Sequence, residues 1–242
     1  MSANQIKAVI FDLDGTLVDS YEAIYLGFQY AYEQMGLKPL SYDEVKVQVG
    51  HSLQRMFSEL LGEERVPQAI KLFRKRYEEV FRDHTHLLPD AREALTELHQ
   101  RGIKLSVATN KLGKFSRAIL ENLQVGNLFS AVIGEGDPAH NIGITNSADG
   151  LNRGIYQPVQ ALNKPYVRGK PDPQMLYLAI EKMGLPKEQT VLVGDSEIDI
   201  QSAHNAGIRV YAIPTGTTGK AELARHNPTA ILDNLKGLLQ YI

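Results

Sequence analysis

Residues 8–20 of this 242-residue chain read AVIFDLDGTLVDS, an apolar run that ends in two aspartates, Asp12 and Asp14. Side chains along a strand alternate between its two faces, so residues two apart point to the same side. Two carboxylates on one side of a buried strand repel each other unless a cation lies beside them. The stretch therefore predicts a strand that carries two acids to its C-terminal end, where Gly15 and Thr16 begin the exit loop.

Four later segments repeat the short apolar run. Besides the first strand at residues 8–13, we predict strands at residues 103–108, 131–133, 190–193 and 209–213. Helical patterns separate them, for example at residues 90–101 and 173–183, each followed by a glycine, which is common just past a helix end. Strands that are apolar on both faces are typical of a parallel sheet covered by helices on both sides. The alternation therefore predicts an α/β fold with a doubly wound parallel sheet.

Residues 20–88 interrupt this alternation with helical patterns alone. Apolar side chains recur at helical spacing over residues 23–35, and residues 41–44 read as a capping box that opens a second helix. Two more helices follow, the last of them opening at Pro67. We therefore predict a small all-helical cap domain, residues 20–88, inserted after the first strand of a core formed by residues 1–19 and 89–242.

Residues 135–168 form a second irregular region, rich in glycine, asparagine and proline and without clear periodicity. Structureless loops longer than about 12–15 residues are uncommon in compact domains and are usually functional or disordered. We interpret this region as an insertion within the core. We favour an insertion without a direct role in function, a disordered decoration of the core. A substrate-related flap is the second interpretation, and a lid or a dimer contact is a further one.

The overall composition limits the classes of protein to consider. The net charge is −2, so nothing suggests the basic surface that nucleic-acid binding needs. The chain contains no cysteine, which excludes disulfides, thiolate nucleophiles and cysteine-based zinc sites. The N-terminus has no apolar signal core, and no later run is long enough to span a bilayer. We expect a cytoplasmic monomer or homodimer that binds neither nucleic acid nor membrane.

Polar side chains also follow two of the later strands and precede one helix. They are Thr109, Asn110 and Lys111 in SVATNK, Lys170 in RGKPDP, and Asp195 and Asp199 in VLVGDSEIDI. The carboxyl ends of parallel strands lie along one edge of the sheet, so these side chains are expected to converge there. A metal and a phosphoryl group would balance the charges of such a site, and Mg²⁺ prefers oxygen ligands of this kind.

The four segments FDLDGT, ATNK, GKPDP and GDSEID resemble, in this order, the four motifs of the haloacid dehalogenase superfamily. The resemblance covers nearly the whole chain and includes a helical cap between the first two motifs. Within the superfamily, the stretches around these motifs are most similar to those of phosphoglycolate phosphatases. The resemblance implies a Rossmann-like core and a Mg²⁺-dependent phosphoric monoester hydrolase that acts on a small phosphorylated metabolite, with phosphoglycolate favoured.

The same resemblance implies a role for each motif residue. Asp12 would attack phosphorus to form an aspartyl-phosphate, and Asp14 would protonate the leaving oxygen and then activate water. Mg²⁺ would be held by the Asp12 side chain, the Asp14 backbone carbonyl and Asp195. The phosphate would be bound by Thr109, Asn110 and Lys170. Lys170 would also neutralise charge during transfer, and Asp199 would orient Lys170 or a water on the metal.

Three residues near the third predicted helix, Gly50, His51 and Arg55, lie where family members reach from the cap into the site. His51 or Arg55 would contact the leaving portion of the substrate, and a surface helix start is an equally good reading. A phosphosugar mutase similar to β-phosphoglucomutase, a pyrophosphatase and a nucleotidase stay open as alternatives. A dehalogenase is disfavoured, because halide leaves without the proton that Asp14 would supply. A catalytically inactive scaffold ranks last, because every motif residue is present.

Overall fold

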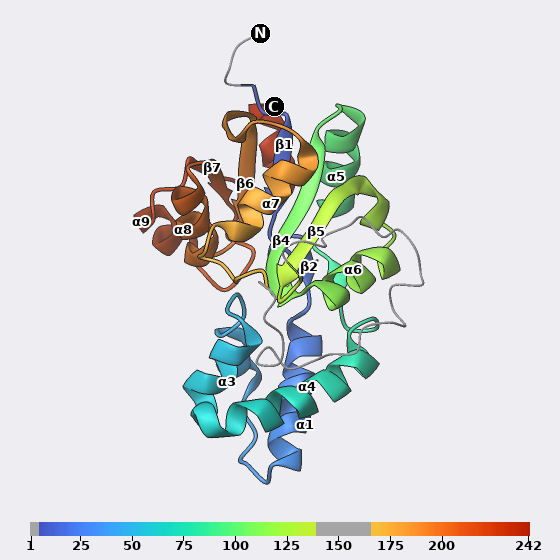
Figure 1. Cartoon of the computed structure of the whole chain (residues 1–242), viewed down its shortest axis with the longest axis vertical. Helices are drawn as coiled ribbons and strands as arrows, with labels where there is room; N and C mark the ends of the chain where they lie inside the picture. Colours follow the sequence, from blue (N-terminus) through green and yellow to red (C-terminus); the bar gives the residue numbers. More distant parts are fainter. Residues whose placement is uncertain (1–4, 139–165) are drawn as a thin grey trace.

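The computed structural model describes residues 5–138 and 166–242 of the chain. Within them, six strands form one parallel sheet in the order β5-β4-β1-β6-β7-β8. The strands are β1 (Ala8–Phe11), β4 (Lys104–Leu112), β5 (Phe129–Glu135), β6 (Thr190–Gly194), β7 (Arg209–Ala212) and β8 (Ala230–Ile231). The chain crosses from β5 past β1 to β6, so the strand order reverses beside β1 (Figure 1). The α/β fold with a parallel sheet is confirmed.

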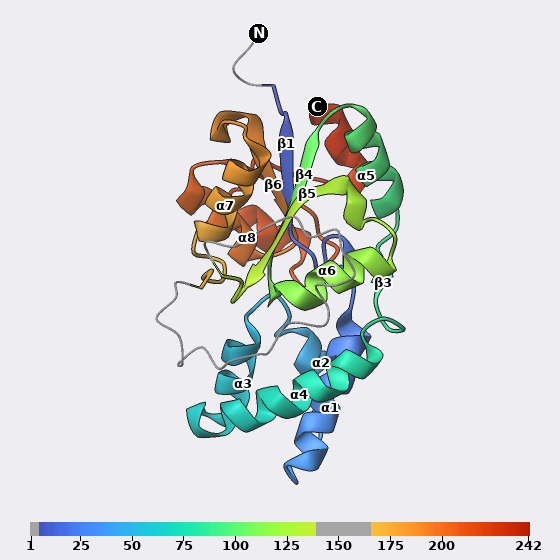
Figure 2. The ribbon, with the colours of Figure 1, turned by 45° about the vertical axis from the view of Figure 1, so that its right-hand side comes forward.

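Both faces of the sheet are buried, as the apolar strands predict. Val9 and Phe11 of β1 belong to one hydrophobic cluster with residues of α5 (Ala91–Gln100) and α6 (Gly113–Asn122). Ala8 and Ile10 belong to the cluster on the opposite face, with residues of α7 (Gln174–Met183) and α8 (Glu197–Ala206). Figure 2 shows these two helix pairs on opposite sides of the sheet. The two-residue alternation of β1 therefore fixes which helices cover which face.

A separate group of helices lies beyond the C-terminal edge of the sheet (Figure 1). Its members are α1 (Tyr21–Gln34), α2 (Tyr42–Lys46), α3 (Leu53–Leu61) and α4 (Val66–Val80). The capping box at residues 41–44 is present. Stacked and edge-on aromatic rings, among them Phe28, Phe57 and Phe73, fill the interior of this group. We call α1 to α4 the helical region.

The helical region and the core share one apolar cluster rather than meeting across a polar gap. The ring of Tyr77 on α4 packs edge-on against Phe115 on α6, with centroids 5.0 Å apart. A short antiparallel pair, β2 (Val18–Asp19) and β3 (His86–Leu87), joins the two chain segments that lead into and out of the helical region. Packing of this kind fixes where α4 lies over the strand ends.

Several predicted boundaries differ from the structure by a few residues. The first strand ends at Phe11 rather than Leu13, and the second runs on to Leu112. The segment predicted to contain helices only also includes β3, and β8 adds a sixth strand to the sheet. These additions are only two residues long, too short for a period of two to be recognised. Most of the predicted insertion at 135–168 lies outside the described residues.

The remaining elements are short, and the first of them connects α3 to α4. They are η1 (Glu63–Arg65), η2 (Gly126–Leu128), η5 (Lys187–Gln189), α9 (Lys220–Arg225) and η6 (Leu235–Tyr241). None of the helices in the two described ranges combines the length and the apolar character needed to cross a bilayer.

Candidate active site

Asp12 lies at the C-terminal end of β1, held to the neighbouring strand by a backbone hydrogen bond of 2.9 Å from its N–H to the carbonyl of Val193. The Lys170 ammonium lies 2.6 Å from Asp12 Oδ1 and 2.6 Å from Asp199 Oδ1. All three side chains are buried, that of Lys170 being only 2% exposed. The structure therefore brings the first, third and fourth motifs together in one buried ion-pair network.

Asp195 completes a group of buried carboxylates. One carboxylate oxygen from each of Asp12, Asp195 and Asp199 lies within 4.8 Å of the others. The Thr16 hydroxyl donates a 2.7 Å hydrogen bond to Asp195 Oδ1. A Cβ on Gly216 would lie 1.7 Å from Asp195 Oδ2, so only glycine at this position lets the backbone approach the carboxylate so closely. The loop after β7 therefore forms part of the site.

Burial and repulsion from neighbouring carboxylates both raise the pKa values of Asp12 and Asp195. Burial raises the pKa of Asp195 well above its ordinary value, and Asp12 and Asp199 raise it further. Burial also raises the pKa of Asp12, although Lys170 acts against it. For Lys170, burial would lower the pKa, but Asp12 and Asp199 outweigh it and raise the pKa above its usual range. Three buried carboxylates thus share a single buried ammonium.

This arrangement fits a divalent metal. The candidate ligands are all carboxylate oxygens, which hard cations such as Mg²⁺ prefer. Three buried acids balanced by one lysine leave an excess of negative charge, and a cation beside Asp12 and Asp195 would favour their ionised forms. The donor set and the charge excess therefore suit a divalent cation, for which Asp12 and Asp195 are candidate ligands.

Asp14 faces a different set of partners from Asp12. The Ser20 hydroxyl, at the N-cap of α1, donates a short hydrogen bond to Asp14 Oδ1. The Lys111 ammonium lies 3.0 Å from Asp14 Oδ2 and 5.0 Å from the centroid of the Tyr77 ring. A cation over a ring at this distance is attracted by about 0.5–2 kcal/mol, more where water is excluded. The two neighbouring aspartates therefore have separate lysines.

The second motif links three parts of the site. The Asn110 side chain donates hydrogen bonds to the carbonyls of Gly50 (2.9 Å) and Lys170 (3.1 Å) and accepts one from the Lys170 N–H (2.6 Å). The Thr109 hydroxyl accepts a hydrogen bond from the Lys111 N–H. Both side chains are buried beside Asp12 and Asp14. Asn110 therefore ties the helical region to the motif that carries Lys170.

A cavity of about 1100 Å³ lies between the helical region and the sheet edge. Among its lining residues are Asp12, Asp14, Gly50 and His51. Burial lowers the pKa of His51, and the Arg55 guanidinium lowers it further. Arg55 itself does not line the cavity. It is exposed and forms a 2.7 Å ion pair with Glu59 on the same helix.

Arg74 of α4, rather than Arg55, is the arginine that the helical region contributes to the cavity lining described here. Glu135, at the end of β5, also lines the cavity. Burial raises the pKa of Glu135 to about 7, against the opposing effect of Arg74. The cavity therefore holds a cation and an acid beyond those of the four motifs.

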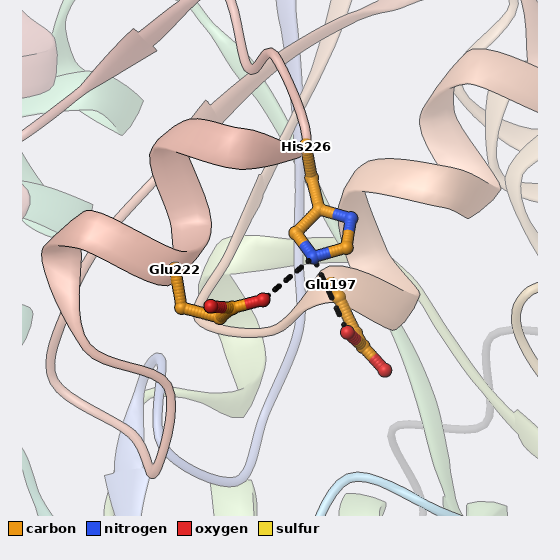
Figure 3. A group of neighbouring side chains, drawn as sticks. All are labelled: Glu197, Glu222 and His226. Atoms are coloured by element: carbon orange, nitrogen blue, oxygen red, sulfur yellow. Dashed lines mark ion pairs between the residues drawn. The ribbon is translucent and has the colours of Figure 1, made fainter.

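A second group of possible ligands consists of Glu197, Glu222 and His226. Figure 3 shows the His226 imidazole directed between the two carboxylates, and its Nε2 lies 3.3 Å from Glu197 Oε2 and 3.5 Å from Glu222 Oε1. The three side chains are 34–54% exposed, and Glu222 also pairs with Arg225. We interpret this group as a solvated ion-pair cluster that joins α8 to α9.

Sequence reasoning missed several residues of the site. Lys111 is quoted in the second motif but has no predicted role, and Tyr77 of α4 has none either. Thr16 and Ser20 lie inside the opening stretch, so their closeness to Asp12 and Asp14 is a signal for both. For Arg74 and Gly216, we find no signal in the sequence that points to the site.

With this geometry in place, comparison with known proteins identifies the family. Residues 6–207 match the model of the haloacid dehalogenase-like hydrolases. The phosphoglycolate phosphatase of Vibrio cholerae is 31% identical over 98% of this chain and 97% of its own length. That of Aliivibrio fischeri is 30% identical over 97% of this chain and 95% of its own length.

Solved structures agree with the fold. A predicted phosphoglycolate phosphatase from Haemophilus somnus superposes with a TM-score of 0.76 at 26% identity, covering 99% of this chain and 98% of its own. A haloacid dehalogenase-like family hydrolase from Streptococcus pneumoniae gives a TM-score of 0.78 at 23% identity over 100% and 99% of the two chains. The chain therefore belongs to the haloacid dehalogenase-like hydrolases and is an enzyme of the phosphoric monoester hydrolase class.

Proposed function

We propose that this chain is a Mg²⁺-dependent phosphatase that hydrolyses a small-metabolite phosphate monoester through an aspartyl-phosphate on Asp12. One observation carries the proposal: Asp12, Asp195 and Asp199 are buried together at the C-terminal edge of the sheet, and the Lys170 ammonium contacts two of them, Asp12 and Asp199. Acids packed this closely suit a site that receives a cation and a phosphoryl group.

The residues of the chain divide the work of the first half-reaction. A carboxylate oxygen of Asp12 forms a bond to phosphorus, and the bond from phosphorus to the leaving oxygen breaks. Asp14 gives its proton to that oxygen. Lys170 offsets negative charge on the transferring group, and Asp199 holds Lys170 through their 2.6 Å contact. Thr109 and the Asn110 backbone N–H bind the remaining phosphate oxygens.

The second half-reaction returns Asp12 to its starting form. Asp14, now a carboxylate, takes a proton from a water molecule that attacks the phosphorus of the aspartyl-phosphate. Inorganic phosphate leaves, and Asp14 is again protonated for the next cycle. Asp12, Asp195 and the backbone carbonyl of Asp14 would hold Mg²⁺, whose positive charge reduces repulsion between the nucleophile and the phosphate.

The substrate class is inferred from the relatives, whose name makes 2-phosphoglycolate the favoured candidate. Residues 20–88 act in this proposal as a cap domain over the core of residues 1–19 and 89–242. Gly50 and His51 line the cavity and stay candidates for contact with the leaving portion. Arg55 is a weaker candidate because it pairs with Glu59 on an exposed face. A cytoplasmic location and a monomer or homodimer remain predictions.

The test is release of inorganic phosphate from a panel of 2-phosphoglycolate, sugar phosphates, nucleotides and pyrophosphate. Mg²⁺ is supplied in one series and removed with a chelator in the other. We expect release with at least one monoester, dependent on Mg²⁺, and acid-stable labelling of Asp12 by the phosphoryl group after rapid quenching. No release from any member of the panel would contradict the proposal, and an isomerised sugar phosphate without release would favour a mutase.

A further inference from the structure

Lys111 is a buried cation for which the catalytic steps above give no role. It lies near the end of β4, its side chain is 9% exposed, and its ammonium is 3.0 Å from Asp14 Oδ2. Burial would lower its pKa, but Asp14 and Tyr77 outweigh it and raise the pKa above the usual range. A buried, charged lysine beside one aspartate is therefore a fixed part of this site.

The two oxygens of Asp14 are held from opposite sides. Ser20, at the start of α1, donates to Oδ1, and Lys111 contacts Oδ2. A carboxyl group offers further acceptor positions and, when protonated, an O–H donor, so two contacts orient the group and leave positions open for a leaving oxygen or water. Orientation of this kind matters, because proton transfer needs the acid within hydrogen-bond reach of its target.

Lys111 is in turn held by the helical region. Its ammonium lies 5.0 Å from the centroid of the Tyr77 ring on α4. Tyr77 is 1% exposed and packs against Phe115 of the core. A displacement of α4 therefore changes the surroundings of Lys111 directly, and those of Asp14 through Lys111.

We propose that Lys111 is the positioning residue for Asp14 and that Tyr77 holds Lys111 in place. The inference rests on the proposed acid–base role of Asp14. If Lys111 and Tyr77 act in this way, the position of the Asp14 carboxyl depends on where α4 lies. The Asp12 carboxylate, by contrast, is held by Lys170, which belongs to the core.

The first test compares variants of two lysines in the whole Mg²⁺-loaded enzyme. Lys111→Met keeps the apolar stem against Tyr77 and removes the ammonium. Lys75→Met is the matched control, because the Lys75 ammonium of α4 also lies near an aromatic ring, 5.7 Å from the Tyr30 centroid, but Lys75 does not line the cavity. We expect Lys111→Met to lower kcat/KM for an alkyl phosphate about 10–100-fold and Lys75→Met to lower it less than about twofold.

The second test asks whether the loss acts through Asp14. In an Asp14→Asn background, adding Lys111→Met should lower kcat/KM by less than about twofold, since residues that act as a unit are not additive. An alkyl leaving oxygen needs a proton, whereas p-nitrophenolate leaves without one. Lys111→Met and Asp14→Asn should therefore show the same substrate pattern. For p-nitrophenyl phosphate, each should lower kcat/KM by less than about threefold. Tyr77→Leu should give the same pattern more weakly.

The outcomes separate this inference from the proposed function. Equal losses for the alkyl and aryl esters, or a full further loss in the Asp14→Asn background, would overturn the positioning role while leaving the phosphatase intact. Thermal unfolding checks that each variant is folded, and Tyr77→Leu carries the test if Lys111→Met is not. A wild-type enzyme inactive on both esters would instead overturn the proposed function, and the inference with it.

Discussion

One hexapeptide, GDSEID, supplies side chains to two clusters of acids that behave in opposite ways. Asp195 and Asp199 enter the buried cluster with Asp12, whereas Glu197 between them joins Glu222 and His226 on the surface. The buried acids are 1–5% exposed and the surface group 34–54%. Ser196 caps the N-terminus of α8, and in the first turn of this helix Glu197 is exposed to solvent while Ile198 and Asp199 are buried.

The difference shows that burial, rather than the types of residue present, determines how strongly the charges of such a cluster interact. Water and salt screen exposed charges, so an exposed ion pair contributes only about 0–1 kcal/mol. Buried charges are not screened in this way, and a group left without its partner costs several kcal/mol. The buried cluster should therefore respond strongly to substitution, metal and pH, and the surface cluster weakly to all three.

The largest effect is expected from Asp12→Asn. The substitution keeps the size of the side chain and removes the nucleophile, so turnover should fall on the order of 10⁴–10⁶-fold while the fold is kept. Phosphate release and circular dichroism measure the two properties. A variant that keeps a tenth of wild-type activity would break the assignment of Asp12 as nucleophile.

A smaller effect is expected from Asp195→Asn, and it should appear as a change in the Mg²⁺ dependence of the activity. Removing a direct carboxylate ligand should raise the Mg²⁺ concentration for half-maximal activity about 100-fold or more, since even outer partners of metal ligands cost 10–100-fold. Glu197→Gln, two residues away in the surface cluster, is the matched control and should leave this concentration unchanged. An equal rise of this Mg²⁺ concentration in both variants would contradict the view that only the buried cluster binds the metal.

Glu135 provides a third case for this comparison, because it is half-buried and belongs to neither cluster. Burial raises its pKa from 4.5 to about 7, so the folded protein binds this proton more tightly than the unfolded chain does. Its contribution to stability is full below pH 4.5 and is lost as the pH rises through 7. Glu135→Gln should therefore raise the free energy of unfolding at pH 8 by about 2 kcal/mol relative to wild type, with little change at pH 4.5. Denaturant titrations at both pH values test this, and a constant difference would contradict it.

The smallest effects are expected in the surface cluster. His226→Asn or Glu222→Gln should change the free energy of unfolding by less than about 0.5 kcal/mol and kcat/KM by less than about twofold. Thermal unfolding with and without Zn²⁺ provides the check. A Zn²⁺-dependent rise in Tm of wild type that His226→Asn abolishes would show that this cluster binds a metal and would reverse our interpretation of it.

The sequence by itself determined the sheet and which of its charged groups meet along one edge. Apolar runs and helix signals predict the parallel α/β fold, because both arise from local periodicity. Asp12, Lys170 and Asp195 are predicted to meet, because parallel strands end at one edge, and the structure places them together. The all-helical character of residues 20–88 is predicted for the same local reasons, apart from the two residues of β3.

Only the tertiary structure decided how these groups are paired. Asp12 and Asp14 are two residues apart, yet they contact different lysines, Lys170 and Lys111. Likewise, α3 turns Arg55 toward Glu59, while α4 brings Arg74 to the cavity. Such choices depend on how helices pack over the sheet, and contacts between residues tens of positions apart leave no periodic trace in the chain. The sequence therefore specifies which groups meet at the edge of the sheet, and packing assigns each its partner.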